Sequence, residues 1–231
     1  MCQRCLVLVL VRMLVTPPML SRRHCLIAAV CASLTAPLAV RAGAYDDFFH
    51  AMELDDAPSV SMLLARGFDA NTPDESGQLG LYLALRLGAD KVVAVLVAHP
   101  STQLDRANAA GETPLMMAAL RGRLPWMKAL LDKGCRVNVD GWSPLHYAAT
   151  SSKEEAVTML VQRGARIDAR SPNGTTALMM AARYGQEGSV DVLLRSGADP
   201  RVRNDRDLSA ADFARLGGRE PLAQRLALVA R

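Results

Sequence analysis

GETPLMMAA, residues 111–119, returns sixty-three residues later as GTTALMMAA, residues 174–182. The stretches GQLGLYLAL, GWSPLHYAA and, in weaker form, DLSAADFA follow the same pattern. The aligned positions are spaced by 34, 30, 33 and 33 residues and are Leu81, Leu115, Leu145, Leu178 and Ala211. A period of this length indicates supersecondary units that stack on one another, and it decides the fold class.

One unit, GETPLMMAALRGRLPWMKALLDKG, contains the start and end signals of two short helices. Thr113 can accept hydrogen bonds from the free amides of a helix start, and Pro114 sits where its missing N–H costs nothing. Gly122 and Gly134 can adopt the left-handed conformation that ends a helix, and Pro125 begins the second one. Each predicted helix spans about two or three turns, fewer than the ~12–15 residues that an isolated helix needs in water. The units must therefore bury their apolar faces on one another.

Alanine pairs in the first helices, at 118–119, 148–149 and 181–182, would let neighbouring helices approach closely. With these pairs, the segments TPL at 113–115 and SPLHYA at 143–148 complete a recognisable pattern. The chain resembles the ankyrin-repeat family, whose repeat of about 33 residues carries a T-P-L-H-x-A signature. The resemblance implies an all-α repeat solenoid of helix-turn-helix units joined by short β-hairpin connections.

The repeats predict four parts along the chain. They are a leader at 1–44, an N-terminal capping repeat at 45–77, four inner repeats at 78–207, and a C-terminal capping repeat and tail at 208–231. The end units depart from the motif, as expected of caps that face water. The unit at 112–141 is three residues short between Gly134 and Leu145. We therefore expect the hairpin connection there, its finger, to be shortened, and we call it the clipped finger.

The leader has the layout of a secretory signal peptide. Two arginines at 22–23 precede an apolar run over residues 25–40, and AGA at 42–44 is an A-x-A cleavage site. The run of about 16 residues is shorter than the ~20 that a membrane-spanning helix needs. We therefore expect cleavage after Ala44, export to the periplasm, and no membrane span in the mature chain. Met19 is the expected true start, and the general and twin-arginine export routes both stay open.

The charge of the chain gives no support for nucleic-acid binding. The 231 residues include 27 basic and 23 acidic side chains, but the leader alone contributes five arginines and no acidic residue. The rest of the chain is close to neutral, so the basic isoelectric point of the whole chain comes from the leader.

No catalytic constellation is recognisable in the sequence. Four of the five cysteines lie in the leader, which leaves Cys135 as a substitute for alanine in a turn or, alternatively, a redox-active thiol. The histidines beyond the leader lie in different units without the spacing of a metal site or a triad: His50, His99 and His146. We predict no enzymatic activity, no cofactor and no metal. Repeated methionines at 116–117 and 179–180 are interpreted as core residues, with copper binding or an adaptable binding surface as the alternatives.

The remaining candidates are surface positions that vary between units. The family resemblance implies that a partner binds the concave side, which is made by hairpin tips and first helices. The candidate residues at those places are Glu112, Trp142, Thr175, Arg121, Arg123, Ser151, Ser152, Arg183, Tyr184 and Gln186. Trp142 beside arginines and a tyrosine has the composition of an interface hot spot. The alternative is that Trp142 packs over the clipped hairpin.

These features predict a module, monomeric before binding, whose partner is another protein. We expect it to act as a scaffold or stabiliser for an envelope or periplasmic protein. Two alternatives stay open, namely a stoichiometric inhibitor or immunity protein against an enzyme toxin, and an effector delivered into another cell. A binding surface does not name its ligand, so the sequence leaves the partner's identity undetermined.

Overall fold

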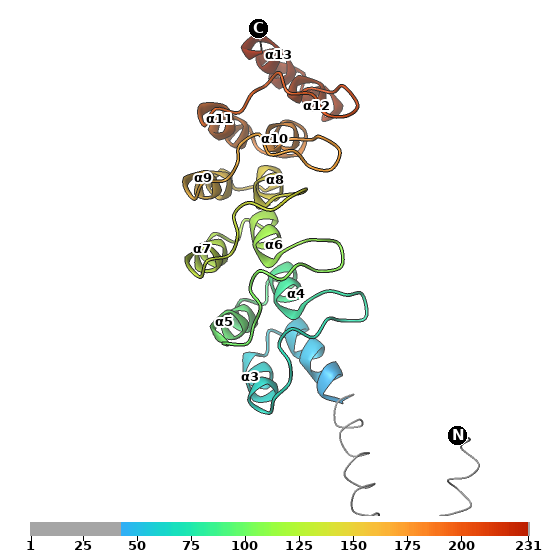
Figure 1. The fold of residues 1–231 in the computed structure, drawn as a ribbon, viewed down its shortest axis with the longest axis vertical. Coiled ribbons are helices and arrows are strands. Elements are labelled where there is room, and N and C mark those ends of the chain that lie inside the picture. The colour runs from blue at the N-terminus through green and yellow to red at the C-terminus, as the bar shows by residue number, and fades with distance from the viewer. Residues whose placement is uncertain (1–42, 231) are drawn as a thin grey trace, which may run out of the picture. The chain divides into compact units, whose positions relative to one another are not determined.

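Pairs of consecutive helices repeat along the chain in the computed structural model, which describes residues 43–230 (Figure 1). The chain divides into two units, Met1–Asp46 and Asp47–Arg231, and the repeats lie in the second apart from residues 43–46 of the first helix. The first helices of the pairs are 43–53, α4 (Gly80–Leu87), α6 (Pro114–Leu120), α8 (Pro144–Thr150), α10 (Ala177–Tyr184) and α12 (Ala210–Leu216). The second helices are α3 (Ala57–Ala65), α5 (Asp90–Ala98), α7 (Leu124–Asp132), α9 (Glu154–Gln162), α11 (Glu187–Arg195) and α13 (Glu220–Val229).

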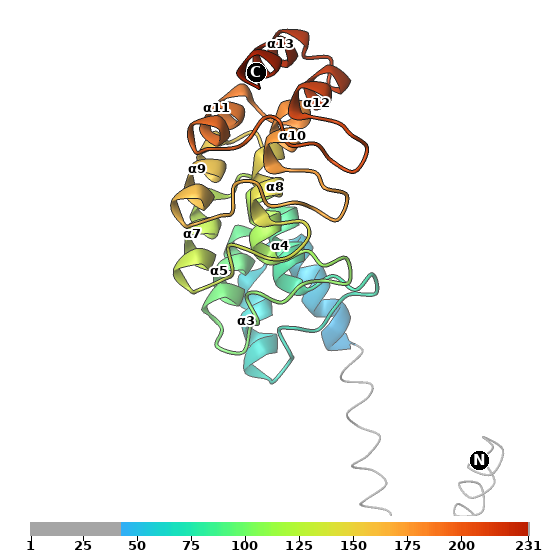
Figure 2. The ribbon, with the colours of Figure 1, turned by 45° about the horizontal axis from the view of Figure 1, so that its top comes forward.

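The two sets of helices form two columns. From α4 to α12 the first helices stack on one another, and the second helices from α5 to α13 stack beside them (Figures 1 and 2). From α4 to α12 each first helix contacts the next, the second helices contact one another between α3 and α5 and along α7, α9 and α11, and the two helices of each pair from α4 to α13 are in contact. The all-α repeat solenoid predicted from the sequence is confirmed.

Reciprocal hydrogen bonds fix the start of the first helices. The amide of Met116 donates to the Thr113 hydroxyl at 3.3 Å, and the amide of Thr113 donates back to the Met116 sulfur at 3.3 Å. Thr176 and Met179 repeat this arrangement at the start of α10. The recurring methionine therefore closes a capping box as well as filling the core, and both first methionines of the MM pairs are buried.

The core lies between the two columns and between successive pairs. The motif residues Leu115, Leu145 and Leu178 are at most 1% exposed, and the alanine pairs that follow them are buried. Gly185 shows how closely α8 and α10 approach, because a Cβ placed there would lie 2.1 Å from the carbonyl oxygen of Ala149. Small side chains thus allow the stacking that the repeat predicts.

Each connection from one helix pair to the next, here called a finger, contains a tight turn. The described residues contain one isolated β-bridge rather than extended strands. In the finger before α6, the amide of Asn108 donates to the carbonyl of Glu112, and the amide of Gly111 donates to the carbonyl of Asn108. Equivalent pairs of bonds close the fingers before α4, α10 and α12. Each finger is too short to add further rungs, so it has the turn of a hairpin without its strands.

The finger before α8 differs from the others. Within the described residues, the connection over 135–143 has none of the backbone bonds that close the other four fingers. This is the connection that the sequence shows to be three residues short. The missing residues belong to the stem of the finger, so its tip has no opposing backbone with which to pair.

The predicted signal peptide lies outside the described residues apart from its last two positions. Within residues 43–230, no helix is long and apolar enough to cross a membrane.

Candidate protein-binding surface

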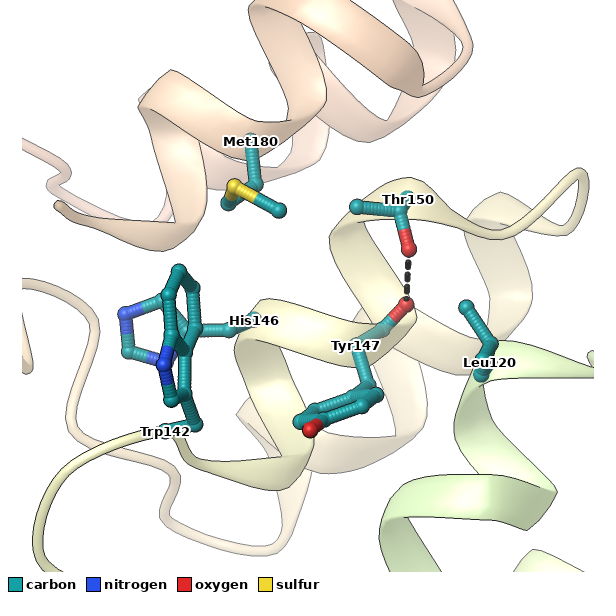
Figure 3. A pocket seen from close by; sticks show the side chains of 6 residues that line it. All are labelled: Leu120, Trp142, His146, Tyr147, Thr150 and Met180. Carbon is teal, nitrogen blue, oxygen red and sulfur yellow. Dashed lines mark hydrogen bonds between the residues drawn. The ribbon is translucent and has the colours of Figure 1, made fainter. Parts of the chain in front are cut away.

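A pocket of about 250 Å³ opens beside the clipped finger (Figure 3). Three successive first helices contribute to it, because Leu120 lies at the end of α6 and Met180 lies on α10, on either side of α8. The finger before α8 and α8 itself supply the other lining residues, which are Trp142, His146, Tyr147 and Thr150.

A buried histidine holds Trp142 at one side of the pocket. The two rings meet edge to face, with centroids 5.3 Å apart and planes at 79°. His146 Nδ1 accepts from the Ser143 amide at 3.1 Å, and His146 Nε2 lies 2.9 Å from the carbonyl oxygen of Thr175. Burial lowers the pKa of His146 below its ordinary value. The neutral ring with its proton on Nε2 satisfies both contacts, so His146 is a fixed support for the indole.

Glu112 fixes the opposite side of the pocket by accepting hydrogen bonds from two tyrosines. Its carboxylate accepts from the Tyr82 hydroxyl at 2.6 Å, the Tyr147 hydroxyl at 2.9 Å and the Asn108 amide group at 3.0 Å. Burial raises the pKa of Glu112, but these hydrogen bonds outweigh burial and the pKa is lowered overall. Burial and the bond to Glu112 raise the pKa of both tyrosines. Glu112 therefore joins three repeats and positions Tyr147 in the pocket.

The end of α10 presents an aromatic and cationic pair to solvent. The guanidinium of Arg183 lies over the Tyr184 ring at 4.9 Å from its centroid. The Tyr184 side chain is 56% exposed, and Gln186, at the start of α11, is also exposed. Met180 precedes Tyr184 by four residues and so lies on the same side of α10. The structure thus brings Arg183 and Tyr184 to the helix that supplies one wall of the pocket.

Other predicted positions are placed differently. Arg121 is exposed at the end of α6, directly after the pocket residue Leu120. Arg123 instead forms an ion pair at 3.3 Å with Asp90, the first residue of the second helix α5. Ser151 is buried and its hydroxyl bonds to the backbone of Lys153, so that hydroxyl is already in use.

The remaining two candidates also differ from each other. The Thr175 side chain is buried, and its carbonyl lies against His146. Ser152 is exposed in the connection between α8 and α9. Thr175 therefore supports the pocket from behind, whereas Ser152 lies at the surface.

Sequence reasoning missed most of the pocket lining. Met116, Met117 and Met179 are buried as predicted, whereas Met180 is half-buried and lines the pocket. Leu120 and Thr150 were also missed. A signal for them exists, because the fifth position after the motif leucine changes in character from unit to unit: Arg86, Leu120, Thr150, Arg183 and Leu216. Residues that vary at one fixed place on the helix are those that the stack does not determine.

The described residues offer no evident metal site or reactive thiol. They contain no group of three or more His, Cys, Asp or Glu side chains arranged to hold a metal ion. Cys135 is buried, its thiol faces the carbonyl of Leu104, and burial raises its pKa to about 11. The thiol is therefore protonated at neutral pH and weakly nucleophilic.

Comparison with known proteins supports the repeat assignment. A family model described as ankyrin repeats, in three copies, matches residues 48–140, 98–171 and 137–204. Over 155 residues the chain is 32% identical to the nuclear factor NF-kappa-B p105 subunit of Gallus gallus, which covers 64% of this chain and 16% of that protein. It is also 32% identical over 127 residues to the neurogenic locus notch homolog protein 1 of Danio rerio, covering 53% of this chain and 5% of that protein. The chain thus spans a small part of these relatives.

A solved structure matches over most of both chains. It is the Bd0816 predatory endopeptidase from Bdellovibrio bacteriovorus in complex with the immunity protein Bd3460. The TM-score is 0.67 at 25% identity, and the match covers 79% of this chain and 97% of the matched chain.

Proposed function

The chain belongs to the ankyrin-repeat family, and we propose that it is a non-catalytic module that binds one partner protein through its first helices and fingers. Ankyrin repeats imply protein–protein interaction. The observation that carries the proposal is the pocket beside Trp142, which opens on this side of the solenoid between three successive repeats. Exposed Arg121 and Tyr184 and half-buried Arg183 lie at the ends of the helices that form it, and arginine and tyrosine are enriched where proteins meet.

The leader supports a partner outside the cytoplasm. Its basic pair, apolar run and A-x-A site are features of an exported chain. On this proposal the mature protein begins near Tyr45, binds in the envelope or periplasm, and stabilises or scaffolds its partner there. Mass spectrometry of the N-terminus of the protein purified from producing cells tests the cleavage, and an intact residue 1 or 19 would contradict it.

A second candidate function, stoichiometric inhibition of an enzyme, is favoured by the structural comparison. The matched structure contains an endopeptidase together with an immunity protein, and the match covers nearly the whole of one chain. An inhibitor needs a rigid surface and a partner held at one-to-one, which a stack of repeats provides. The partner would then be an enzyme that the producing cell must restrain.

Affinity capture with the full chain tests both candidates. The bait is compared with one carrying Trp142→Ala, Arg183→Ala and Tyr184→Ala, and with a control carrying Lys128→Ala on the second-helix side, in extracts of the producing cells. We expect one protein to be retained at one-to-one by the first and third baits and lost by the second. Retention of nothing, or of the same proteins by all three, would contradict the assignment.

The retained protein then separates the two candidates. An inhibitor abolishes the partner's enzymatic activity at a one-to-one ratio, whereas a scaffold leaves that activity intact and lengthens the partner's lifetime against proteolysis.

A further inference from the structure

Three arginines at the ends of first helices have no carboxylate partner. Arg86 lies in the last turn of α4, Arg121 is the C-cap of α6, and Arg183 lies in the last turn of α10. Among residues 43–230, none of them has an acidic side chain within the 4.0 Å of an ion pair. Their charges are therefore available to a bound molecule.

The carboxylate of Glu112, which interacts with Arg86, is already committed. Glu112 accepts from Tyr82, Tyr147 and Asn108, and the charge of Arg86 helps to lower its pKa. A further cation lies nearby, because the aliphatic stem of Lys153 lies over Gly122, next to Arg121. Around the pocket, Arg121 and Arg183 therefore keep positive charges that no ion pair among the described residues neutralises.

The interior of the pocket has few free polar groups. Both ring nitrogens of His146 are bonded, the Tyr147 hydroxyl donates to Glu112, and the Thr150 hydroxyl donates to the carbonyl of Tyr147 (Figure 3). The remaining lining is the indole of Trp142 and the side chains of Leu120 and Met180. An occupant with polar groups would lose its hydration without gaining partners, so the pocket favours an apolar group.

The size of the pocket points to a single side chain. Its volume of about 250 Å³ is below the ~300–1,000 Å³ typical of sites for small-molecule ligands. One aromatic or branched aliphatic side chain is an occupant of this scale. Met180 can adjust to its shape, because methionine is unbranched and flexible.

We infer that the pocket beside Trp142 receives an aromatic or branched aliphatic side chain from an acidic segment of the partner protein. Carboxylates on either side of that side chain pair with Arg121 and Arg183. The inference rests on the proposed function and adds the chemistry by which the partner is recognised. A nucleic acid or an anionic membrane would satisfy the arginines but would leave the apolar pocket unfilled.

Model peptides test this chemistry without the natural partner. The chain contains two tryptophans, so a Trp126→Phe variant of the full chain leaves Trp142 as the reporter of the pocket. Its fluorescence is titrated with the peptides Asp-Asp-Phe-Asp-Asp, Asp-Asp-Ala-Asp-Asp and Lys-Lys-Phe-Lys-Lys, and with a single-stranded oligonucleotide. We expect a saturable change with the first peptide and at least about tenfold weaker binding for the other three probes.

Two variants locate the bound peptide. Arg121→Gln with Arg183→Gln removes the two rim charges at exposed or half-buried sites and is expected to weaken the acidic peptide about tenfold. Arg163→Gln, on the second-helix side, is the matched control and leaves the affinity unchanged. Binding of the acidic peptide should also weaken as salt rises, because the rim charges are screened.

Several results would overturn the inference. One is the absence of a Trp142 signal with the acidic peptide, and another is equal binding of the alanine or lysine peptide. Equal binding of the oligonucleotide would show that the surface recognises negative charge alone. The capture experiment separates the two proposals, because a one-to-one partner that survives Arg121→Gln with Arg183→Gln leaves the binding module intact and removes only this inference.

Discussion

The two columns of helices use their arginines in different ways. Along the second helices, arginines pair with carboxylates of the preceding repeat: Arg123 with Asp90 at 3.3 Å, Arg163 with Asp132 at 2.6 Å and Arg225 with Asp191 at 3.0 Å. At the ends of the first helices, Arg86, Arg121 and Arg183 have no such partner among the described residues. Ion pairs on the second helices therefore tie neighbouring repeats together, whereas these three arginines of the inner first helices are left without one. Arg215 at the end of α12, in the terminal repeat, does pair with Asp212 at 2.9 Å.

On the proposed function, this difference separates residues that hold the stack from residues that face a partner. A residue of the first kind should change the stability of the chain when it is replaced, and a residue of the second kind should change binding. Four substitutions or pairs of substitutions test the division, beginning with the largest expected effect.

Leu145→Ala should cause the largest loss of stability. The side chain is 1% exposed at the centre of the stack, and deleting it leaves a cavity that costs about 2–5 kcal/mol. Chemical denaturation measures the loss. Leu87→Ala is the control, because Leu87 is 49% exposed at the end of α4 and should change stability little. A negligible effect of Leu145→Ala would contradict the stacked core.

Glu112→Ala should cost about 1–3 kcal/mol, because it leaves two tyrosine hydroxyls without their acceptor and removes one of the two acceptors of the Asn108 amide group. Glu112 was selected from the sequence as a partner contact, so this substitution tests whether it instead holds the stack together. Glu112→Gln keeps an acceptor oxygen and should cost less. If both variants are as stable as the parent chain, Glu112 does not hold the three repeats together.

Acidification should weaken the fold through His146. Burial depresses its pKa in the folded chain, so the unfolded chain takes up a proton first, below about pH 6.5. This contribution to stability is complete above that pH and falls below it by up to about 1.4 kcal/mol per pH unit. Denaturation of the parent chain and His146→Gln between pH 8 and pH 5 measures the difference. Parallel curves for the two proteins would be evidence against a neutral, buried ring.

Arg123→Ala should have the smallest effect on stability, at most about 1 kcal/mol, because the pair with Asp90 is partly exposed. Arg121→Ala, two residues earlier, should leave stability unchanged, since Arg121 has no ion-pair partner among the described residues. Thermal unfolding of the two variants makes the comparison. Equal losses would erase the distinction between the columns.

The sequence predicted the fold well because each repeat contains the residues that begin and end its two helices. Thr113 and Pro114 carry the cap and first-turn chemistry of a helix start, and the alanine pairs in the first helices permit close stacking. The three missing residues before Leu145 predicted the clipped finger for the same reason, since a loop length can be counted. These features depend on local chemistry and on comparison of one unit with the next.

The pocket was harder to predict because it depends on how three repeats meet. Met180 occupies a position where Met117 is buried, and only the neighbouring α8, with Tyr147 and the shortened finger, leaves it accessible. Arg121 and Arg123 lie two residues apart, yet Arg123 pairs with Asp90 of α5, whereas Arg121 is exposed and has no ion-pair partner among the described residues. Such differences come from the packing between units, which the residues of one unit do not reveal.

Once the partner has been captured, calorimetric titration and thermal unfolding are carried out on Arg121→Gln with Arg183→Gln and, in parallel, on Arg123→Gln with Arg163→Gln. The division between the columns predicts a crossed result, in which the first pair loses affinity at unchanged stability and the second loses stability at unchanged affinity. Loss of affinity by the second pair alone would place the partner on the second helices and contradict the account.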